Sequence, residues 1–509
     1  MKRILCLCLC AVLLLSGCAG KGEYTPTGDA LEYGDDYTGP TYVREQEAQS
    51  LTLTWYSGRT MNPFNCTDFT NQALFSLLYQ GLFSPDRNYG TEPILCKSYR
   101  VSEDMKTYTF YPEDAVFSDG THMSAADVKA SYDAAKNSKN YSGRFQHIQS
   151  VELSADGGVV VSLDTPYEDL PLILDIPIVP AGQVEADRPI GTGPYKLGKT
   201  TTGDCLQRRT DWWCKAQLDV SAETIPLMEA GSPTQIRDSF QFGGLDLVCA
   251  DPGSDRYADY RCDYELWDSE NGIFVYIAFC ANSEVFSDPE VRAAVTYAVD
   301  RDTITATEYR GFARSASLPA SPLFPYYSST LAGKYRYDPE KFARIVQTKE
   351  LADKEVIFLV NSDDSLRLRV ARTIAQSMTA GGLMVTLKPL GGNAYQKAIR
   401  NREFDLYLGQ TRLSANMDLS PFFSQNGELS FGGVNNVSAF TLCQEALANH
   451  GNYYTLHKSV MDNGLLCPIL FRSYSIYATR GLISRLSPSR DSVFHYSLGK
   501  TMSEAQIKE

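Results

Sequence analysis

An uninterrupted apolar segment at residues 272–279 constrains the fold of this chain more than any other feature. Its sequence is Gly-Ile-Phe-Val-Tyr-Ile-Ala-Phe, with no charged residue in it. A run of this kind is typical of a strand that is covered on both faces. Asp288 and Pro289 follow it as a helix cap and a first helical residue. The pattern therefore predicts a buried strand followed by a helix, as in an α/β protein.

Strands and helices alternate along the rest of the chain. The strands predicted from apolar, aromatic and β-branched runs lie at residues 51–56, 108–111, 159–163, 356–360, 385–387 and 404–408. Helices are predicted at residues 71–79, from Pro289 through Val299, and at residues 366–378. One more helix is predicted after Ser124, where Asp127 three residues later comes close to a capping box. This alternation favours an α/β fold.

Length and charge exclude several classes of protein. The chain has 509 residues, enough for two or three domains. Hydrophobic residues make up 43% and charged residues 21%, values that suit a globular protein and argue against disorder. The net charge is −14 and no basic run follows the first three residues, so nucleic acid is not an expected partner.

The N-terminus has the pattern of a secretory signal. Lys2 and Arg3 precede a twelve-residue apolar run at residues 4–15, which is too short to span a bilayer as a mature helix. Cys18 follows Leu-Ser-Gly and resembles the lipobox of bacterial lipoproteins, which implies a signal peptide at residues 1–17 and diacylation of Cys18. The alternative is a short signal anchor with a chance cysteine. Residues 18–49 are polar and rich in Gly, Pro and acidic side chains, and we interpret them as a flexible tether.

The remaining cysteines do not form a metal or redox motif. No C-x-x-C pair and no zinc-type Cys/His spacing is present, so no metal and no cofactor are predicted. Their number is odd, so at least one is expected to be free unless it pairs between chains. For most of them we expect a small buried apolar role. They are Cys66, Cys96, Cys205, Cys214, Cys249, Cys262, Cys280, Cys443 and Cys467.

A series of short motifs, in a fixed order, resembles one protein family. The motifs are Asn62-Pro63, Leu78 to Phe83, Val101 to Asp104, Tyr108 to Phe110, Phe117 to Thr121, Ala126 to Val128, the Gly-Thr-Gly-Pro-Tyr segment from Gly191, Asp288 to Arg292, Tyr297 to Arg301, Tyr337 to Lys341, Pro468 to Leu470 and Ile476 to Ala478. Together they cover about residues 50–485 and resemble the family 5 extracellular solute-binding proteins, which include oligopeptide-, dipeptide- and nickel-binding proteins.

The resemblance implies an α/β, two-lobed periplasmic-binding-protein-like fold of type 2, in the large family 5 variant. Lobe one is expected at residues 50–270, with an extra subdomain at about 90–175. Lobe two is expected at residues 271–470, and residues 471–509 are expected to return to lobe one and form the tail. The ligand would lie between two lobes that close by a hinge motion.

The resemblance also implies a function. A monomeric, lipid-anchored protein on the outer side of the cell membrane would capture a small solute, with a peptide as the expected ligand. It would deliver this ligand to an ABC permease with its ATPase subunits. The alternatives are a sugar, opine or metal-chelate ligand, or a role as a signal receptor or surface chaperone. A lipid-anchored hydrolase is a further alternative, but no nucleophile–base constellation supports it, so no enzymatic activity is predicted.

Three short motifs have an enzymatic or nucleotide-binding interpretation, which we weigh against chance. Gly191-x-Gly193 lacks the third glycine of a dinucleotide loop, so a turn at the start of a strand is favoured. Gly499-Lys500-Thr501 lacks the first glycine of a P-loop, since Phe494 stands in its place. Ser497-x-x-Lys500 matches a penicillin-binding motif by spacing alone.

Charged and polar loop residues supply the candidate ligand contacts. Dipeptide-binding relatives hold a carboxylate with an arginine after a lobe-two strand and an ammonium with a later aspartate. The first of these loops, residues 361–364, lacks an arginine in this chain, so Arg412 is expected to meet a carboxylate and Asp418 or Asp363 an amine. For each charge a plain surface-loop role is the alternative, and Trp55 has a core role as its alternative. The candidate ligand-binding residues are Trp55, Tyr56, Asn65, Asn361, Asp363, Gln410, Arg412, Asn416 and Asp418.

Overall fold

A computed structural model describes residues 51–500 apart from residues 217, 219, 253–259, 353, 426, 435 and 484, together with the backbone of Ile507–Lys508. The predicted signal peptide, the tether and Cys18 lie outside the described residues. No helix among the described residues has the length and apolar character needed to cross a membrane.

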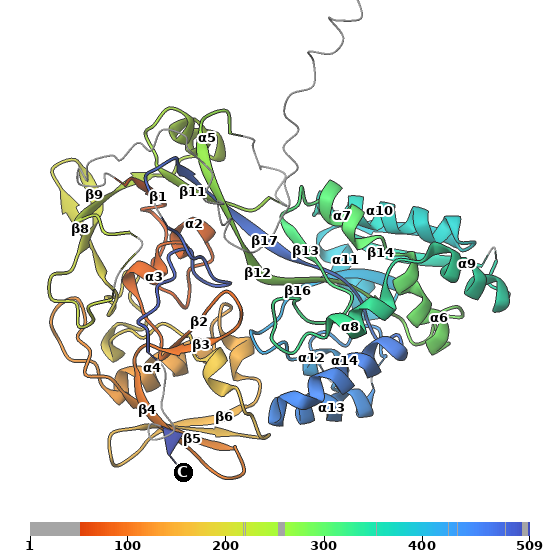
Figure 1. Cartoon of the computed structure of the whole chain (residues 1–509), viewed down its shortest axis with the longest axis horizontal. Helices are drawn as coiled ribbons and strands as arrows, with labels where there is room; N and C mark the ends of the chain where they lie inside the picture. Colours follow the sequence, from red (N-terminus) through yellow and green to blue (C-terminus); the bar gives the residue numbers. More distant parts are fainter. Residues whose placement is uncertain are drawn as a thin grey trace, which may run out of the picture. The chain divides into compact units, whose positions relative to one another are not determined.

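The largest sheet, here called the long sheet, is built around two long antiparallel strands, β12 and β17 (Figure 1). Its strand order is β11-β17-β12-β16-β14-β15, and β13 also pairs with β17. The strands are β11 (Leu247–Ala250), β12 (Tyr264–Phe279), β13 (Ala313–Ser315), β14 (Glu355–Asn361), β15 (Met384–Leu390), β16 (Leu406–Arg412) and β17 (Cys467–Thr479). The strand predicted at residues 272–279 is the second half of β12 and is paired on both sides.

Both faces of β12 are covered, as its sequence predicts. Phe274 and Tyr276 pack into one apolar cluster and Val275 and Ile277 into another, because successive side chains of a strand point to opposite faces. Helices supply the covering layers, and α10 packs against β14 and β15. The helices of this half are α6 (Pro289–Ala294), α7 (Arg301–Thr307), α8 (Ser329–Ala332), α9 (Pro339–Thr348), α10 (Ser365–Ala380), α11 (Gly392–Asn401), α12 (Ser420–Phe423), α13 (Val437–Ala448) and α14 (Tyr453–Asp462).

The first half of the chain forms smaller sheets, one of which also includes β18 from the C-terminal end. The short sheet has the order β1-β10-β9-β8, and the outer sheet has the order β18-β4-β5-β7-β6. Their strands are β1 (Leu53–Trp55), β4 (Cys96–Val101), β5 (Thr107–Pro112), β6 (Ile148–Leu153), β7 (Val159–Leu163), β8 (Tyr195–Thr200), β9 (Gly203–Arg208), β10 (Thr224–Glu229) and β18 (Ile507–Lys508). A hairpin of β2 (Phe83–Pro85) and β3 (Thr91–Pro93) completes the strands described in this half. Its helices are α2 (Phe69–Gln72), α3 (Phe75–Leu78), α4 (Ala125–Lys136) and α5 (Pro233–Gln241).

Two predicted helices differ from the observed ones. The helix predicted at residues 71–79 is divided into α2 and α3. The amide of Leu74 bonds the carbonyl of Asn71 and the amide of Leu77 bonds the carbonyl of Leu74, each three residues back, which tightens the chain between the two short helices. The helix predicted from Pro289 continues after α6 only as a 3₁₀ turn, Val295–Ala298. The predicted capping box is present, since Asp127 accepts a hydrogen bond from the amide of Ser124 at 2.8 Å.

The two long strands connect the two halves of the chain (Figure 1). The first half is formed mainly by residues 51–250, and the second half mainly by residues 274–471. One large apolar cluster is formed mainly by residues before 250 and by the C-terminal segment, and two others are formed mainly by residues 274–471. The predicted lobe boundaries at 270/271 and 470/471 fall inside β12 and β17. The division of the chain at these residues stays a prediction.

Candidate functional site

A cavity of about 380 Å³ lies where the two halves and the C-terminal segment meet. Aromatic and apolar side chains of the first half, among them Phe69, Phe75 and Ile94, form part of its wall. The ends of β12 and β16 contribute Ile273 and Arg412, and residues 489–496 cover another side. A concave, mainly apolar site with a few polar groups is the usual form of a small-molecule site.

Three arginines and two aspartates form a charged cluster in the wall of this cavity. Arg144 Nη2 lies 2.7 Å from Asp175 Oδ2 and 3.9 Å from Asp491 Oδ2. Arg412 Nη2 donates to Asp491 Oδ1, and Arg490 Nε lies 3.6 Å from Asp491 Oδ2. The Asp491 carboxylate is therefore shared between three guanidinium groups, of which only Arg412 lies within hydrogen-bond distance.

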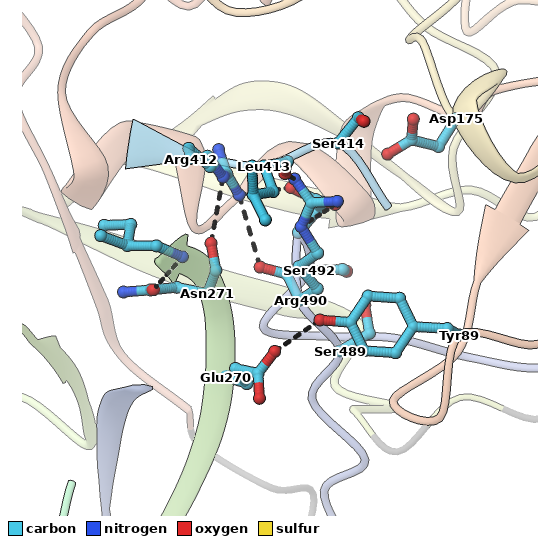
Figure 2. A network of polar contacts seen from close by, with 12 residues as sticks. Tyr89, Asp175, Glu270, Asn271, Arg412, Leu413, Ser414, Ser489, Arg490 and Ser492 are labelled. Carbon is cyan, nitrogen blue, oxygen red and sulfur yellow. Dashed lines mark hydrogen bonds and ion pairs between the residues drawn. The ribbon is translucent and has the colours of Figure 1, made fainter. Parts of the chain in front are cut away.

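Regular backbone structure holds these side chains in position. Arg412 is the last residue of β16 and pairs with Ile273 of β12, and its Nε donates to the carbonyl of Asn271 at 3.1 Å. Arg490 Nη2 donates to the carbonyl of Leu413 at 2.5 Å (Figure 2). Gly272 has a φ of +72°, and a Cβ there would lie 2.4 Å from Arg490 Nε. A glycine at this position therefore gives Arg490 the room to lie against β12.

Burial and mutual charge shift the ionisation of the cluster. Burial opposes ionisation of Asp491, but Arg490, Arg412 and Arg144 outweigh it and hold the pKa of this carboxyl far below its ordinary value. Burial raises the pKa of Asp175, and the charge of Arg144 only partly offsets this. Burial also lowers the pKa of Arg490. The cluster therefore keeps Asp491 charged and makes the Arg490 cation costly to bury.

One of the residues predicted from the loops, Arg412, lines the cavity. Gln410 lies two residues earlier on β16, and its Oε1 accepts a hydrogen bond from Arg472 at 3.0 Å. Asn416 contacts the hydroxyl of Tyr167, and Asp418 lies 3.1 Å from His147. These last two residues are buried between the two halves and are not among the described residues of the cavity wall.

The other predicted residues lie elsewhere. Trp55 is buried in the core of the first half, under the guanidinium of Arg188. Tyr56 stacks with Arg59, and Asn65 is exposed. Asn361 and Asp363 organise the loop after β14: Asn361 Oδ1 accepts from the amide of Asp363 at 2.9 Å, and Asp363 Oδ2 accepts from the amide of Gly392 at 2.7 Å. Their role as ligand contacts stays a prediction.

Arg144, Asp175, Arg490 and Asp491 are not among the site residues predicted from the sequence. The adjacent Arg490 and Asp491 follow Ser487-Pro488-Ser489, in a tail with no apolar periodicity. The only local signal is a pair of charges in a segment that has no helical or strand pattern. Their proximity to Arg144 and Asp175 depends entirely on long-range packing.

The described residues contain no metal-binding cluster of three or more His, Cys, Asp or Glu side chains. The nine cysteines that follow the N-terminal segment are all described and are free thiols, six of them buried. Arginine and aspartate side chains thus carry the strong polar chemistry of the cavity wall.

Known proteins resemble this chain in sequence and in fold. The sequence model described as "Bacterial extracellular solute-binding proteins, family 5 Middle" matches residues 90–430, more than half of the chain. The glutathione-binding protein GsiB of Escherichia coli K12 is 27% identical over 305 residues. That alignment covers 57% of this chain and spans 59% of the length of GsiB.

Two solved structures show the same fold at low identity. NikA from Brucella suis, in complex with Fe(III)-EDTA, has a TM-score of 0.67 at 20% identity, covering 87% of this chain and 98% of NikA. The oligopeptide-binding protein AppA from Bacillus subtilis, in complex with a nonapeptide, has a TM-score of 0.59 at 19% identity, covering 87% of this chain and 97% of AppA. These likenesses confirm the predicted two-lobed α/β fold of the binding proteins. The chain belongs to the bacterial extracellular solute-binding proteins of family 5.

Proposed function

We propose that this protein is the solute-binding component of an ABC importer and that its ligand is a short peptide. The observation that carries the proposal is the cavity between the two halves, in which four largely buried charged side chains and the half-exposed Arg412 face an apolar wall. Peptides combine a carboxylate, an ammonium group and apolar side chains, and this wall offers a partner for each. The protein would bind and release its ligand unchanged, without enzymatic activity.

The size of the cavity favours a peptide of two or three residues. A volume of about 380 Å³ lies near the lower end of the range of about 300–1,000 Å³ that is usual for small-molecule sites. The nonapeptide in the AppA structure is much larger than this cavity. Glutathione, which the name of GsiB gives as its ligand, is a tripeptide and has the appropriate size.

The electrostatics of the wall support a ligand with both charges. Guanidinium groups bind carboxylates through strong charge-assisted hydrogen bonds. Asp175 Oδ1 is buried and has no hydrogen-bond partner among the described residues, so an ammonium group would satisfy it. Because the wall is formed by both halves, ligand binding would favour closure about the long strands β12 and β17.

We also propose that Cys18 carries the lipid that holds the protein at the outer side of the membrane, as a monomer. The support is the Leu-Ser-Gly-Cys sequence after an apolar run. Cells that express the full chain in the presence of a clickable palmitate analogue should yield a labelled protein, and the Cys18→Ser variant should not. Equal labelling of the two proteins would contradict the proposal.

The peptide proposal is tested with the soluble chain that begins at Ala19, purified from cells grown in rich medium. Native mass spectrometry followed by release of bound molecules should show dipeptides or tripeptides, and calorimetry should give binding without turnover. Pools of longer peptides and metal chelates serve as comparison ligands. A protein that carries no peptide and shows no thermal shift with dipeptide and tripeptide pools would contradict the proposal.

A further inference from the structure

We infer that Arg490, in the C-terminal segment, is the anchor for a carboxylate of the ligand, so that the site selects short peptides with a free C-terminal carboxylate. The inference rests on the proposed function, because it assumes that the cavity takes a peptide. Arg490 lies outside both loops in which the family resemblance places a carboxylate or ammonium contact.

The first observation is that Arg490 is buried without enough partners. Its side chain is only 7% exposed, and it belongs to the cavity wall. Among the described residues, its Nε and Nη1 atoms are buried and have no hydrogen-bond partner. Only Nη2 has one, the carbonyl of Leu413. Unmade hydrogen bonds of a buried guanidinium are costly, so an acceptor that reaches these nitrogens would relieve that cost.

The second observation is an imbalance of charge. Among the described residues, Arg144, Arg412 and Arg490 form ion pairs within 4 Å only with Asp175 and Asp491, which leaves three cations to share two carboxylates. The Asp491 carboxylate cannot serve all three arginines, since it lies 3.6 Å from Arg490 Nε and 3.9 Å from Arg144 Nη2. A ligand carboxylate would give Arg490 a counter-charge of its own.

Two other carboxylates near the cavity are already engaged. Asp251 accepts two hydrogen bonds from Arg472 Nη2, at 2.7 and 2.8 Å. Glu270 accepts hydrogen bonds from Tyr89 and from Ser321. Among the described residues, the one cation within 4 Å of Glu270 is Arg314, at 3.9 Å, and Arg490 acts on this carboxyl only from a longer distance. Neither carboxylate therefore replaces the missing partner of Arg490.

The third observation is that Arg490 is held in place before any ligand binds. Its guanidinium lies against Gly272, in the part of β12 where the register with β17 shifts between Glu270 and Phe274. The adjacent carbonyl of Leu413 fixes its orientation (Figure 2). A cation that is rigidly placed loses little entropy when it binds an anion, which favours affinity and selectivity.

The test compares one tripeptide as the free acid and as its C-terminal amide, by calorimetry on the soluble chain that begins at Ala19. Wild-type protein should bind the acid about ten- to a hundredfold more tightly than the amide, as expected for a hydrogen bond to a charged group. In Arg490→Gln the affinity for the acid should fall by a similar factor, while the affinity for the amide stays the same. Arg490→Lys should retain part of the preference, since it keeps the charge but not the fork of donors.

Arg400→Gln, on the exposed face of α11, is the matched control and should behave as wild type. Equal affinity of the wild type for acid and amide overturns the inference and leaves the peptide proposal intact, and this result does not depend on whether a variant folds. An unchanged acid preference in a folded Arg490→Gln protein also overturns it. Failure of the wild type to bind either form overturns the proposed peptide function itself.

Discussion

His147 and Asp418 form a buried contact between the two halves of the chain, with 3.1 Å between Nε2 and Oδ2. The other ring nitrogen, Nδ1, lies 3.1 Å from Asp164 Oδ1, so the imidazole has a carboxylate at each end. Only a protonated ring can donate to both. His147 directly precedes β6 of the outer sheet, and Asp418 lies between β16 and α12. The aspartate predicted as a ligand contact is thus engaged in a contact that holds the halves together.

Replacement of Asp418 by Asn should destabilise the protein by about 1–3 kcal/mol, because a buried charged hydrogen bond is lost and the imidazolium keeps only one carboxylate. Urea unfolding measures the change. The matched control is Asp114→Asn, which removes the carboxylate from an exposed pair in which His122 Nδ1 lies 2.9 Å from Asp114 Oδ1. Exposed pairs contribute about 0–1 kcal/mol. Equal losses in the two variants would show that burial of the His147–Asp418 pair has no energetic consequence.

Stability should decline as the pH rises above about 6.5. Burial opposes protonation of His147, but the hydrogen bonds and charges of Asp418 and Asp164 outweigh it and raise the pKa above its ordinary value of 6.5. A raised pKa in the folded state means that the stabilisation is fully present below about pH 6.5 and is lost as the pH passes through the raised value.

The free energy of unfolding is measured across that pH range for the wild type and for His147→Gln. The difference between the two curves is the decline that is attributable to His147. The subtraction is needed because a second histidine, His450, adds a pH dependence of its own. Burial opposes its protonation, but the carboxylates of Asp169 and Glu168 outweigh this and raise its pKa. A difference that stays constant with pH would contradict a role for protonated His147.

Arg412→Ala should weaken the binding of an anionic ligand by about 1.5–3 kcal/mol. Arg412 lines the cavity and is the hydrogen-bond partner of Asp491, so its removal takes away a cation and leaves Asp491 to repel the ligand carboxylate. Calorimetry measures the dissociation constant, with the surface variant Arg400→Ala as the control. An unchanged dissociation constant for Arg412→Ala would remove this residue from the site.

Gly193→Ala should reduce stability by about 1–3 kcal/mol or more, as expected for an atom forced into a packed interior. A Cβ at Gly193 would lie 2.5 Å from backbone atoms of Leu77 and Leu78, which cannot move aside as a flexible side chain would. The control is Gly182→Ala, where a Cβ meets nothing within 4 Å. Thermal unfolding compares the two, and a Gly193→Ala protein as stable as the control would show that the backbone yields at this point.

The packing of Gly193 explains the role of the Gly191-x-Gly193 motif, which resembles part of a dinucleotide loop in the sequence. Gly191 and Gly193 both lie against the backbone of Leu78, and the amide of Gly193 donates to the carbonyl of Leu78 at 3.0 Å. The glycines are needed for close approach to the end of α3 at the start of β8. This agrees with the predicted turn at a strand start.

The sequence by itself determined seven of the strands, the helices α4 and α10, and the caps of α4 and α6; the strands are β1, β5, β7, β12, β14, β15 and β16. The alternate packing of Phe274 and Val275 follows from the pleat of a strand, and the cap on α6 follows from Asp288, whose Oδ1 accepts from the amide of Glu290 at 2.8 Å. Such features depend on residues a few positions apart, so a local pattern contains them. The helix predicted at 71–79 is instead divided between Gln72 and Phe75, next to Asn71, whose Oδ1 accepts a longer-range hydrogen bond from the amide of Tyr56 at 2.8 Å.

Only the tertiary structure decided which charges share the cavity. Arg144, Asp175 and Arg490 come from three separate segments, and nothing in their local sequence distinguishes them from surface charges. Asp418 carries the residue type expected of a ligand contact, yet packing places His147 beside it. Local pattern predicts secondary structure because hydrogen bonds and side-chain period act over a few residues. A charged site depends on which distant segments desolvate one another, and that is fixed only when the chain has folded.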